Sequence, residues 1–306
     1  MQIFRHFPDT PLAPTALAIG NFDGVHLGHQ GILKRLSEVS VARSLSPSLL
    51  TFEPHPREFF TPDNAPARLT SIREKLELFA DHGVAQCYIC HFDAAFAAMS
   101  AETFTHEVLR HSLDTRCVLV GEDFRFGAKR AGTTHDLQQA GIVVENLPDV
   151  QVDGIRVSST AARQALAAGN LAQAKRLLGR DYSISGHVVH GDKLGRELGY
   201  PTANVQMQHD NPPLTGIYAV KLGGLQSGEL SGVASLGVRP TMKQDGKPTL
   251  EVHLFDFDQN IYGQHVQVKF LKKIRDEAKF PNLESLKQQI ALDEQAARIY
   301  FLNEAK

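Results

Sequence analysis

The sequence predicts a doubly wound parallel α/β domain in residues 1–182, followed by a small antiparallel β-barrel domain with a C-terminal helix in residues 183–306. Three observations lead to this fold class. The 306 residues are long enough for two domains rather than one. The first half of the chain alternates strand-like runs with helical patterns. The second half has strand-like runs joined by connections that contain Gly, Pro and Asp.

The alternation in the first half predicts a parallel sheet with helices on both faces. Ligands bind beyond the carboxyl ends of the strands in such sheets, so we expect a site at that edge. Two short helices follow, at 160–168 and 171–178, and end at Gly169 and Gly179. The expected strands are 16–20, 48–52, 86–90, 117–121 and 142–147, and the helical patterns between them begin near His26, Ser71, Ser100 and His135.

After Arg180 the pattern changes to strands with no helix between them. In the last strand, Val266, Val268 and Phe270 alternate with polar residues, as on a half-buried antiparallel strand. Several such strands in about 90 residues indicate a small barrel. The expected strands are 182–190, 216–222, 232–236, 250–257 and 265–271. A final helix has Asn282 as its expected N-cap and, at helical spacing, Leu283, Leu286, Ile290, Ala297 and Phe301.

The composition is that of a soluble globular protein, with 42% hydrophobic and 22% charged residues. The net charge of −2 gives no support to a general nucleic-acid or membrane-surface binder. No stretch approaches the length of a membrane span, and the first residues lack the apolar core of a signal peptide. We therefore expect a cytoplasmic protein without nucleic-acid or membrane partners. The sequence leaves its oligomeric state open.

The three cysteines are expected to be structural. Cys87 and Cys90 form a C-x-x-C pair, which invites a redox or metal-binding interpretation. They stand in a strand-like run, however, where residues three apart point to opposite faces of the sheet. Cys117 is the one further cysteine, so no second pair completes a zinc site, and the histidines show no spacing such as H-E-x-x-H.

The stretch ALAIGNFDGVHLGHQG, residues 16–31, has the pattern of an anion-binding site. A buried strand leads into a turn with Asp23 and Gly24, and a helix begins near His26. The first turn of a helix carries free N–H groups and the positive end of the dipole. His26 and His29 are three residues apart there, so both imidazoles can lie over one spot and stabilise negative charge. Because they follow a strand in a loop, we expect them to be exposed.

Three further polar segments follow strands at the same predicted edge of the sheet. They are EPHP at 53–56, GEDFRFG at 121–127 and VSSTAAR at 157–163. The last offers three hydroxyl groups at a helix start, from Ser158, Ser159 and Thr160, with Arg163 one turn further on. Each segment alone is an ordinary loop or N-cap, but their common position indicates a site.

The second domain contains a glycine-rich stretch, HGDKLGRELGYPTANV, at residues 190–205. The chain has neither a P-loop nor a protein-kinase glycine loop, so this stretch is the candidate phosphate cradle. Lys193 or Arg196 can neutralise phosphate, and Thr202 and Asn204 offer oxygens that suit a hard cation such as Mg²⁺. A glycine-rich hairpin loop is the plainer interpretation of the same residues.

Both stretches resemble known signatures. GNFDGVHLGH is similar to the H-x-G-H signature of the nucleotidyltransferase superfamily, and its longer form resembles the FAD synthetase module of bacterial bifunctional riboflavin kinase/FAD synthetases. HGDKLGRELGYPTANV resembles the riboflavin kinase signature, and Glu251 in TLEVHLFDF matches the catalytic glutamate of that family. The resemblance spans nearly the whole chain and implies a nucleotidyltransferase-like first domain.

The resemblance also implies a role for each matching residue. The catalytic residues are His26, His29, Arg163 and Glu251, the last as the base or orienting group for the attacking hydroxyl. Thr202 and Asn204 bind Mg²⁺ with the ATP phosphates. The contacts to flavin or adenine come from Phe52, His55, Asp123 and Arg275. The other ATP and phosphate contacts come from Gly20, Phe22, Asp23, Gly24, Ser158, Ser159, Thr160, Gly191, Lys193, Gly195 and Arg196.

Two departures from the family pattern are present. Ala161 and Ala162 stand where relatives often carry a basic and a branched residue, which affects a secondary contact rather than the activity. Ser235 in ASLGVRPT stands where asparagine is usual, and we expect an altered contact there rather than a lost one.

The resemblance implies a bifunctional enzyme that acts on small molecules, namely ATP, riboflavin and FMN. The C-terminal module would phosphorylate riboflavin to FMN, and the N-terminal module would transfer AMP from ATP to FMN, giving FAD and pyrophosphate, both with Mg²⁺. One alternative is an FMN adenylyltransferase whose barrel is a regulatory flavin sensor. Loss of Glu251 or of the P-T-A-N residues would favour it, and neither is lost. The other alternative is a non-catalytic flavin- or nucleotide-binding protein.

Overall fold

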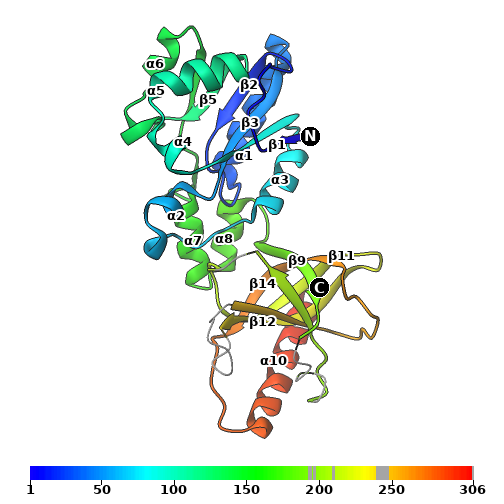
Figure 1. Cartoon of the computed structure of the whole chain (residues 1–306). Coiled ribbons are helices and arrows are strands. Elements are labelled where there is room, and N and C mark those ends of the chain that lie inside the picture. The colour runs from blue at the N-terminus through cyan, green and yellow to red at the C-terminus, as the bar shows by residue number, and fades with distance from the viewer. Residues whose placement is uncertain (192–194, 196–197, 209–210, 239–247, 305–306) are drawn as a thin grey trace. The chain divides into compact units, whose positions relative to one another are not determined.

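The computed structural model describes residues 1–191, 195, 198–208, 211–238 and 248–304. The chain divides into two compact units, one made of Met1–Pro66 and Ile72–Ser158, the other of Ala67–Ser71 and Ser159–Lys306. The first unit contains a parallel sheet and the second a closed barrel (Figure 1). Within the described ranges, no helix has both the length and the apolar character that crossing a membrane requires.

The first unit is built on a six-stranded sheet in the order β1-β4-β3-β2-β5-β6. Every neighbouring pair of these strands runs parallel. The five residues of β2 are all buried because the strand lies inside the sheet rather than at its edge. The strands are β1 (Gln2–Phe4), β2 (Thr15–Ile19), β3 (Ser46–Glu53), β4 (Gln86–His91), β5 (Thr115–Gly121) and β6 (Val143–Leu147).

Helices cover both faces of this sheet, which confirms the predicted doubly wound fold. On one face, Leu33 of α1 (Leu27–Arg43) and Phe79 of α3 (Ile72–Asp81) pack in one cluster. On the other face, η2 (Phe104–Ser112) and α6 (Thr134–Gln139) contribute to a second cluster. The strand order reverses between β2 and β5, so the loop after β2 stands where sheets of this kind bind ligands.

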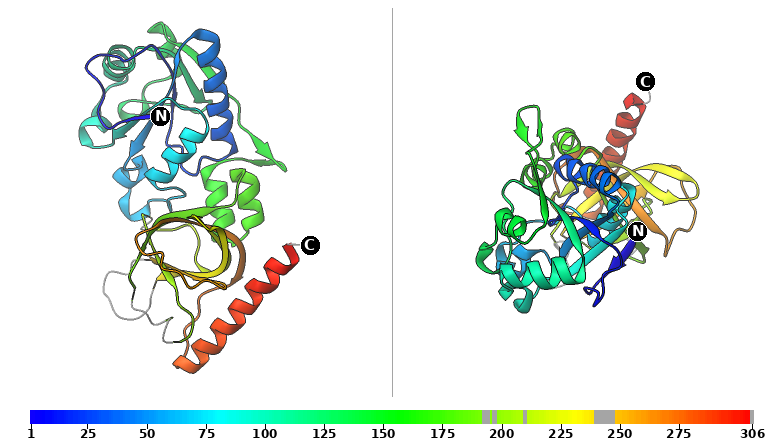
Figure 2. Two further views of the ribbon diagram at one scale, coloured as in Figure 1. Left: turned by 90° about the vertical axis from the view of Figure 1, so that its right-hand side faces the viewer. Right: turned by 90° about the horizontal axis from the view of Figure 1, so that it is seen from above.

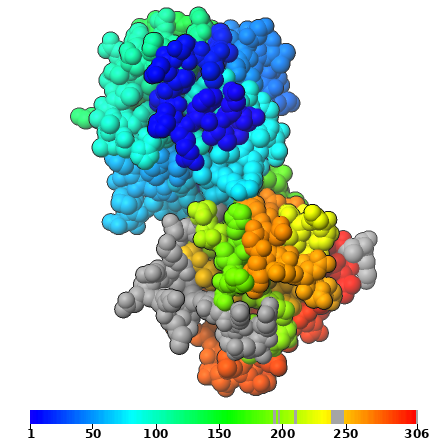
Figure 3. All heavy atoms as spheres, turned by 45° about the vertical axis from the view of Figure 1, so that its right-hand side comes forward, coloured from blue at the N-terminus to red at the C-terminus, as the bar shows by residue number. Residues whose placement is uncertain are grey.

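Several short elements of the first unit were not predicted. β1 is only three residues long, too short to show alternation, yet it pairs with β4 at the edge of the sheet. Figure 3 shows these N-terminal residues, in dark blue, on the surface of the unit. The other short elements without a prediction are α2 (Pro56–Phe60), η1 (Pro62–Asn64), α4 (Ala94–Ala98), η3 (Ala128–Arg130), β7 (Gln151–Val152) and β8 (Ile155–Arg156). The helical stretch predicted to begin near Ser100 is present as α5 (Ala101–Thr103), which leads directly into η2.

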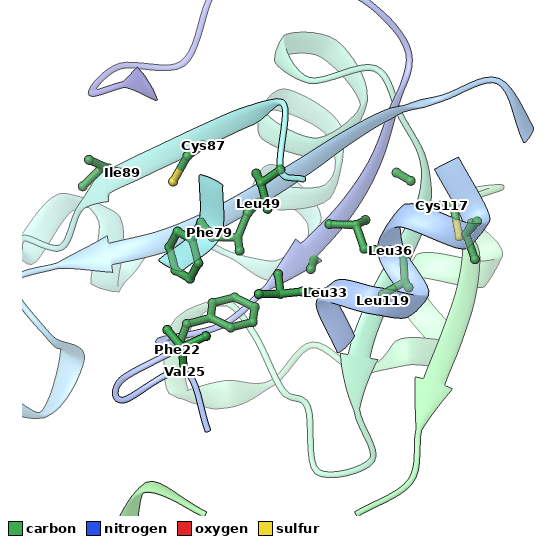
Figure 4. Close-up of a cluster of buried hydrophobic side chains, with 14 residues drawn as sticks. Phe22, Val25, Leu33, Leu36, Leu49, Phe79, Cys87, Ile89, Cys117 and Leu119 are labelled. Carbon is green, nitrogen blue, oxygen red and sulfur yellow. The ribbon is translucent and has the colours of Figure 1, made fainter. Parts of the chain in front are cut away.

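Cys87 and Cys90 lie on opposite faces of the sheet, as strand geometry predicts. Cys87 packs in the cluster that contains Phe79, and Cys90 packs in the cluster on the other face. Cys117 shares the cluster of Cys87, at a separate place within it (Figure 4). Burial raises the pKa of Cys87 and of Cys90 to about 12. Both thiols are therefore protonated, and unreactive as nucleophiles, at neutral pH.

We expect the double substitution Cys87→Ala/Cys90→Ala to leave formation of the expected products, FMN and FAD, insensitive to reductant. In the unaltered protein, both thiols should resist alkylation by iodoacetamide at pH 8 until the chain is unfolded, because each is buried and protonated. Mass spectrometry of the alkylated peptides measures this directly. A disulfide between the two cysteines in active protein, or zinc bound by them, would contradict the structural assignment.

The second unit contains a closed barrel of antiparallel strands in the order β10-β13-β12-β11-β14-β9, with β9 paired to β10. Figure 3 shows β14, in orange, beside β9, in green. Val266, Val268 and Phe270 are buried, which confirms the predicted alternation along β14. The strands are β9 (Ser183–Val189), β10 (Ala203–Met207), β11 (Gly216–Leu225), β12 (Gly228–Val238), β13 (Pro248–Leu254) and β14 (His265–Arg275). Of these, β10 was not predicted as a strand, because it belongs to the glycine-rich stretch.

Helix α10 (Leu283–Glu304) packs along the outside of the barrel (Figure 2). Asn282 Oδ1 accepts a hydrogen bond from the Ser285 N–H at 2.8 Å, which confirms the predicted N-cap. Leu283 is 58% exposed, so the packed face of the helix begins after it. The cluster between helix and barrel is formed by Ile217, Ala219, Val233, Phe255, Ile274, Ala297, Tyr300 and Phe301.

Helices α7 (Ser159–Ala167) and α8 (Leu171–Leu178) belong to the compact unit that contains the barrel, and α8 contacts β14. Gly169 and Gly179 follow the two helices with left-handed φ values of 69° and 71°, as expected for glycines at helix ends. The assignment of residues 1–182 to one catalytic module stays a prediction.

Candidate active sites

The loop after β2 carries the GNFDGVHLGH residues and is fixed in the core of the first unit. The Gly20 N–H donates to the Leu50 carbonyl at 3.1 Å. Phe22 and Val25 both have left-handed backbone angles, φ 51° and 40°. Such angles are costly for residues with side chains and persist only where the surroundings hold them. Figure 4 shows the reason: Phe22 and Val25 point into the cluster that contains Phe79.

The prediction that the histidines of this loop are exposed is wrong for His26. Its side chain is buried, and Asp23 beside it is buried as well, while His29 is half-buried. The cause is the anchoring of the loop at two points, Phe22 and Val25, which draws the polar residues between and after them below the surface. A loop that supplies its own core residues does not follow the usual exposure of loops.

The backbone of this loop is also held from neighbouring elements. The Asn21 carbonyl accepts hydrogen bonds from Thr51 Oγ1 of β3, at 3.2 Å, and from Lys75 Nζ of α3, at 3.5 Å. Lys75 is only 1% exposed, so its charge lies beneath the loop rather than in solvent. Neither contact could be predicted from sequence, because a threonine is common in any strand and a lysine is common in any helix.

The two imidazoles of the loop are stacked, which confirms the prediction that they lie over one spot. Their ring centroids are 3.6 Å apart, at 15°. His26 is the N-cap of α1, and its Nδ1 accepts the His29 N–H at 3.3 Å. A neutral His26 therefore carries its proton on Nε2, which gives a hydrogen-bond donor at the helix start. Gly28 allows this arrangement, because a Cβ there would press on the His26 ring at 3.2 Å.

The other predicted residues of the first unit have mixed surroundings. Phe52 is half-buried, with its ring centroid 5.8 Å from that of Phe92. His55 is the N-cap of α2, and its Nδ1 accepts the Arg57 N–H at 3.1 Å. The Asp123 side chain is exposed and pairs with Arg156 at 3.1 Å. These contacts give His55 a structural role and leave the ring of Phe52 and the carboxylate of Asp123 beside solvent.

The S-S-T-x-x-R residues lie at the start of α7. Ser158 ends the first unit, whereas Ser159, Thr160 and Arg163 belong to the second. Thr160 is exposed, and Arg163 is half-buried with its Nε donating to the Ala67 carbonyl at 2.6 Å. Of the two departures from the family pattern in this helix, Ala162 is fully buried and Ala161 half-buried.

In the second unit, the fold joins the two ends of the glycine-rich stretch. A Cβ at Gly191 would collide with the side-chain amide of Asn204. A Cβ at Gly195 would collide with the Tyr200 carbonyl and lie 3.2 Å from Thr202 Oγ1. The glycines are therefore required for close approach of the loop to Thr202 and Asn204, as predicted from the stretch. Lys193 and Arg196 lie outside the described residues.

Asn204, Glu251 and Ser235 form a row across three neighbouring strands. Glu251 of β13 is opposite Asn204 of β10 on one side and opposite Ser235 of β12 on the other. Residues opposite each other in antiparallel strands share a face of the sheet. All three are half-buried, while Val252, next to Glu251, is fully buried. The prediction that Glu251 lies on the face opposite Val252 is confirmed, and the Ser235 departure falls beside it.

Arg275 is held by the final helix. Its Nε and Nη2 donate to the two carboxylate oxygens of Asp293 at 2.8 and 2.7 Å, and Asp293 is only 4% exposed. The guanidinium thus fastens the end of β14 to α10. Glu277, two residues on, lies against Gly237 of β12, where a Cβ would collide with its carboxylate. Burial raises the pKa of Glu277, and the nearby Arg275 opposes this shift.

A pocket of about 510 Å³ opens beside the glycine-rich stretch. Barrel residues Val188, Ala203 and Val252 form apolar walls, and Thr202 lies in its lining. The volume is in the range of small-molecule sites. The remaining lining comes from Pro201, Leu254, Phe257, Asp258, Gln259, Asn260, Ile261 and Tyr262. Sequence reasoning did not identify the segment after β13, because its residues form no recognisable motif.

The described residues contain no group of three or more His, Cys, Asp or Glu side chains arranged to hold a metal ion.

Comparisons with known proteins match both units of the chain. A family model described as FAD synthetase matches residues 9–161, and one described as riboflavin kinase matches residues 178–301. The bifunctional riboflavin kinase/FMN adenylyltransferase of Escherichia coli strain K12 is 46% identical over 308 residues, covering 98% of both chains. The protein of the same description from Haemophilus influenzae is 45% identical, covering 98% of this chain and 99% of its own.

A solved structure from Streptococcus pneumoniae, described as a macrolide-efflux protein, has a TM-score of 0.81 and 29% identity. It covers 97% of this chain and 99% of its own, so the similarity includes both units. With two family models in the expected order and relatives matched over nearly their full length, the chain belongs to the family of bifunctional riboflavin kinase/FMN adenylyltransferases.

Proposed function

We propose that the two units carry the two reactions of this family. The barrel site transfers the γ-phosphate of ATP to the 5′-hydroxyl of riboflavin, giving FMN and ADP. The loop at residues 20–29 supports transfer of AMP from a second ATP to the phosphate of FMN, giving FAD and pyrophosphate. The observation that carries the proposal is the pairing of Asn204 with Glu251, a carboxylate beside the residue expected to hold phosphate.

In the phosphorylation, Glu251 accepts the proton of the riboflavin hydroxyl. The hydroxyl oxygen forms a bond to the γ-phosphorus, the bond from that phosphorus to the β-phosphate oxygen breaks, and ADP leaves with its electron pair. Asn204 and Ser235 flank Glu251 in the row, so their polar side chains help to orient the attacking group. The reaction requires little more of the protein than positioning and charge stabilisation.

We assign Mg²⁺ to Thr202 and Asn204. Their side-chain oxygens are the hard ligands that this ion prefers, and Gly191 provides a cradle against Asn204 that a Cβ would fill. When bound, the ion neutralises charge on the phosphates of ATP. Gly191, Gly195, Lys193 and Arg196 are the proposed phosphate contacts around it.

The pocket beside Thr202 suits the nucleoside part of the same ATP. Its apolar walls fit a base, and Asp258 and Asn260 supply polar groups that can orient it. Because Thr202 belongs both to this pocket and to the glycine-rich stretch, a nucleoside in the pocket has its phosphates directed toward the proposed metal ligands.

In the adenylyl transfer, a phosphate oxygen of FMN attacks the α-phosphorus of ATP while the bond to pyrophosphate breaks. His26 donates from Nε2, and His29 adds a second imidazole at the start of α1, so both can stabilise the charge that develops on the α-phosphate. Arg163 and the three hydroxyls before it are proposed to bind the triphosphate. Gly20, Phe22, Asp23 and Gly24 are proposed to shape the rest of the nucleotide site.

The proposed flavin contacts come from both units of the chain. Phe52 offers a ring face, and Asp123 offers an exposed carboxylate, for the flavin or adenine of the adenylyl-transfer site. For the kinase site, Arg275 is proposed to border the flavin from its fixed position on Asp293. At the adenylyl-transfer site, His55 is proposed to act through the shape of the EPHP turn, because it caps the helix that follows.

We further propose that residues 1–182 form the FAD synthetase module and residues 183–306 the riboflavin kinase module. Both modules would act in the cytoplasm, on small molecules alone and without nucleic-acid or membrane partners. The two family matches, over residues 9–161 and 178–301, support two modules in this order. The second match begins five residues before the proposed boundary, and the compact units divide earlier, between Ser158 and Ser159.

Incubation of purified protein with riboflavin and Mg²⁺–ATP, followed by chromatography of the flavins, tests the proposal. FMN and then FAD are expected. If riboflavin stays unchanged while supplied FMN becomes FAD, the protein is an adenylyltransferase with a flavin-sensing barrel. Tight flavin binding with no turnover of ATP would indicate a non-catalytic binding protein.

Substitution of Gly191 by alanine is expected to lower kcat/KM of riboflavin phosphorylation about a hundredfold, because the added Cβ displaces the Asn204 side chain. Adenylylation of supplied FMN should be unchanged, and a melting temperature close to that of the unaltered protein reports that the barrel is folded. Gly223→Ala is the matched control, since a Cβ there meets Glu229 at an ordinary 3.7 Å. Equal kinase activity of the two variants would argue against the cradle.

A further inference from the structure

Beside the proposed phosphate site, the backbone pairing of β10 with β13 gives way to a side-chain contact. The ladder between β10 and β13 ends at the pair Ala203 and Val252. Beyond it stands Pro201, which has no N–H group and cannot extend the ladder as a donor. The side chain of His253 makes the next contact between the two strands, with its Nδ1 2.9 Å from the Pro201 carbonyl oxygen.

The chemistry of this contact fixes the tautomer of His253. A carbonyl oxygen only accepts hydrogen bonds, so Nδ1 must carry a hydrogen and donate. This is possible for the neutral ring with its proton on Nδ1 and for the doubly protonated ring alike.

The imidazole is itself held in place by aromatic neighbours. The ring of Tyr200 meets it edge to face at a centroid distance of 5.4 Å, and the ring of Phe255 lies at 6.2 Å. Phe255 is buried, and the Arg298 guanidinium of α10 lies 4.3 Å from its centroid. Arg298 is fixed in turn by both carboxylate oxygens of Asp256, at 2.9 and 3.1 Å. His253 thus has little freedom to move away from Pro201.

We propose that His253 is a positioning residue of the kinase site, which sets the place of Thr202 by holding the carbonyl of the residue before it. This rests on the proposed function, in which Thr202 binds Mg²⁺ and phosphate. His253 and Glu251 are two apart on β13 and share a face of the strand. Strand β13 therefore carries the proposed base, Glu251, and also holds Thr202 in place through the contact of His253 with Pro201. The backbone of β13 thus sets the distance between Glu251 and Thr202.

Two substitutions separate the hydrogen bond from the ring packing. His253→Phe keeps an aromatic ring between Tyr200 and Phe255 but has no donor. His253→Asn loses the ring but places an amide N–H near the position of Nδ1. We expect His253→Phe to raise the KM for Mg²⁺–ATP in riboflavin phosphorylation about tenfold, the size of one lost hydrogen bond, with the KM for riboflavin unchanged. His253→Asn should recover most of the loss.

Adenylylation of supplied FMN by the same preparations measures the amount of active protein, and the melting temperature together with the KM for riboflavin reports that the barrel is folded. If His253→Phe does not fold, His253→Leu replaces it, because leucine and asparagine have similar shapes and only asparagine donates. The inference is overturned if the variant without a donor keeps the KM for Mg²⁺–ATP of the unaltered protein. It is also overturned if His253→Phe, which keeps the ring, has a lower KM for Mg²⁺–ATP than His253→Asn, which keeps the donor. Thr202→Ala separates the role of Thr202 from that of His253. Unchanged kinase activity in that variant refutes the proposed role of Thr202 in binding Mg²⁺ and phosphate.

Discussion

Replacement of His29 by alanine is expected to lower the rate of FAD synthesis from supplied FMN by about a hundredfold or more, the effect of removing a major charge-stabilising donor. The imidazole lies at the start of α1 and is stacked on His26 at 3.6 Å. It is therefore placed where a helix N-terminus and a second imidazole already favour negative charge. Phosphorylation of riboflavin by the same variant should be unaffected.

The stability of the His29→Ala variant should change little. The side chain is half-buried and its neighbours are the rings of His26 and Phe22, the latter with its centroid at 5.0 Å. We expect the melting temperature to fall by less than about 5 °C, as for loss of a partly exposed contact. A variant with near-normal FAD synthesis would remove His29 from the proposed catalytic residues.

His26 offers a comparison, because it combines a chemical role with a structural one. His26→Ala loses both the imidazole and the N-cap acceptor for the His29 N–H. His26→Asn keeps a good N-cap and loses only the imidazole. We expect FAD synthesis to fall in both variants, with the melting temperature lower for alanine than for asparagine. Equal activity of His26→Asn and the unaltered protein would show that capping is the whole role of this residue.

The features that the sequence predicts well are those encoded over a few residues. Alternation along β13 places Glu251 on the face opposite Val252, and the helices ended by Gly169 and Gly179 are recognisable from local pattern alone. The stacking of His26 on His29 follows from their spacing at a helix start. In each case the period of the strand or helix fixes the direction of the side chain.

The features that the sequence does not predict depend on residues far apart along the chain. The contact of Lys75 with the Asn21 carbonyl spans 54 residues, and that of His253 with Pro201 spans 52. The burial of His26 depends on where Phe22 and Val25 find space in a core formed by other elements. Such contacts leave no periodic signal, since they are set by the packing of whole elements on one another.

Arg275 illustrates a different limit. Family resemblance assigns it to the border of the flavin site, but resemblance carries no information about which partner a guanidinium already has. The paired hydrogen bonds to Asp293 hold Arg275 between β14 and α10. A planar guanidinium held by a carboxylate in this way is fixed in orientation, which suits it to shape a site even where it does not bind the flavin directly.

Substitution of Glu251 by glutamine should separate the two reactions. Glutamine keeps the size of the side chain and its place between Asn204 and Ser235 but cannot accept the proton of the ribityl hydroxyl. We expect kcat for FMN formation to fall by about 10²- to 10⁴-fold, the usual contribution of a general base. Adenylylation of supplied FMN should continue at the rate of the unaltered protein, because the loop at residues 20–29 belongs to the other unit.

His29→Ala should show the reverse behaviour, with riboflavin accumulating as FMN. A mixture of the two variants should then form FAD from riboflavin, because FMN released by one molecule can bind the intact adenylyl-transfer site of the other. Loss of FMN adenylylation in folded Glu251→Gln protein would contradict two separate sites. If each variant behaves as stated but the mixture forms no FAD, the assignment of two separate sites is retained, and the assumption that FMN is freely released is wrong. FMN made at the barrel would then have to reach the second site within one molecule.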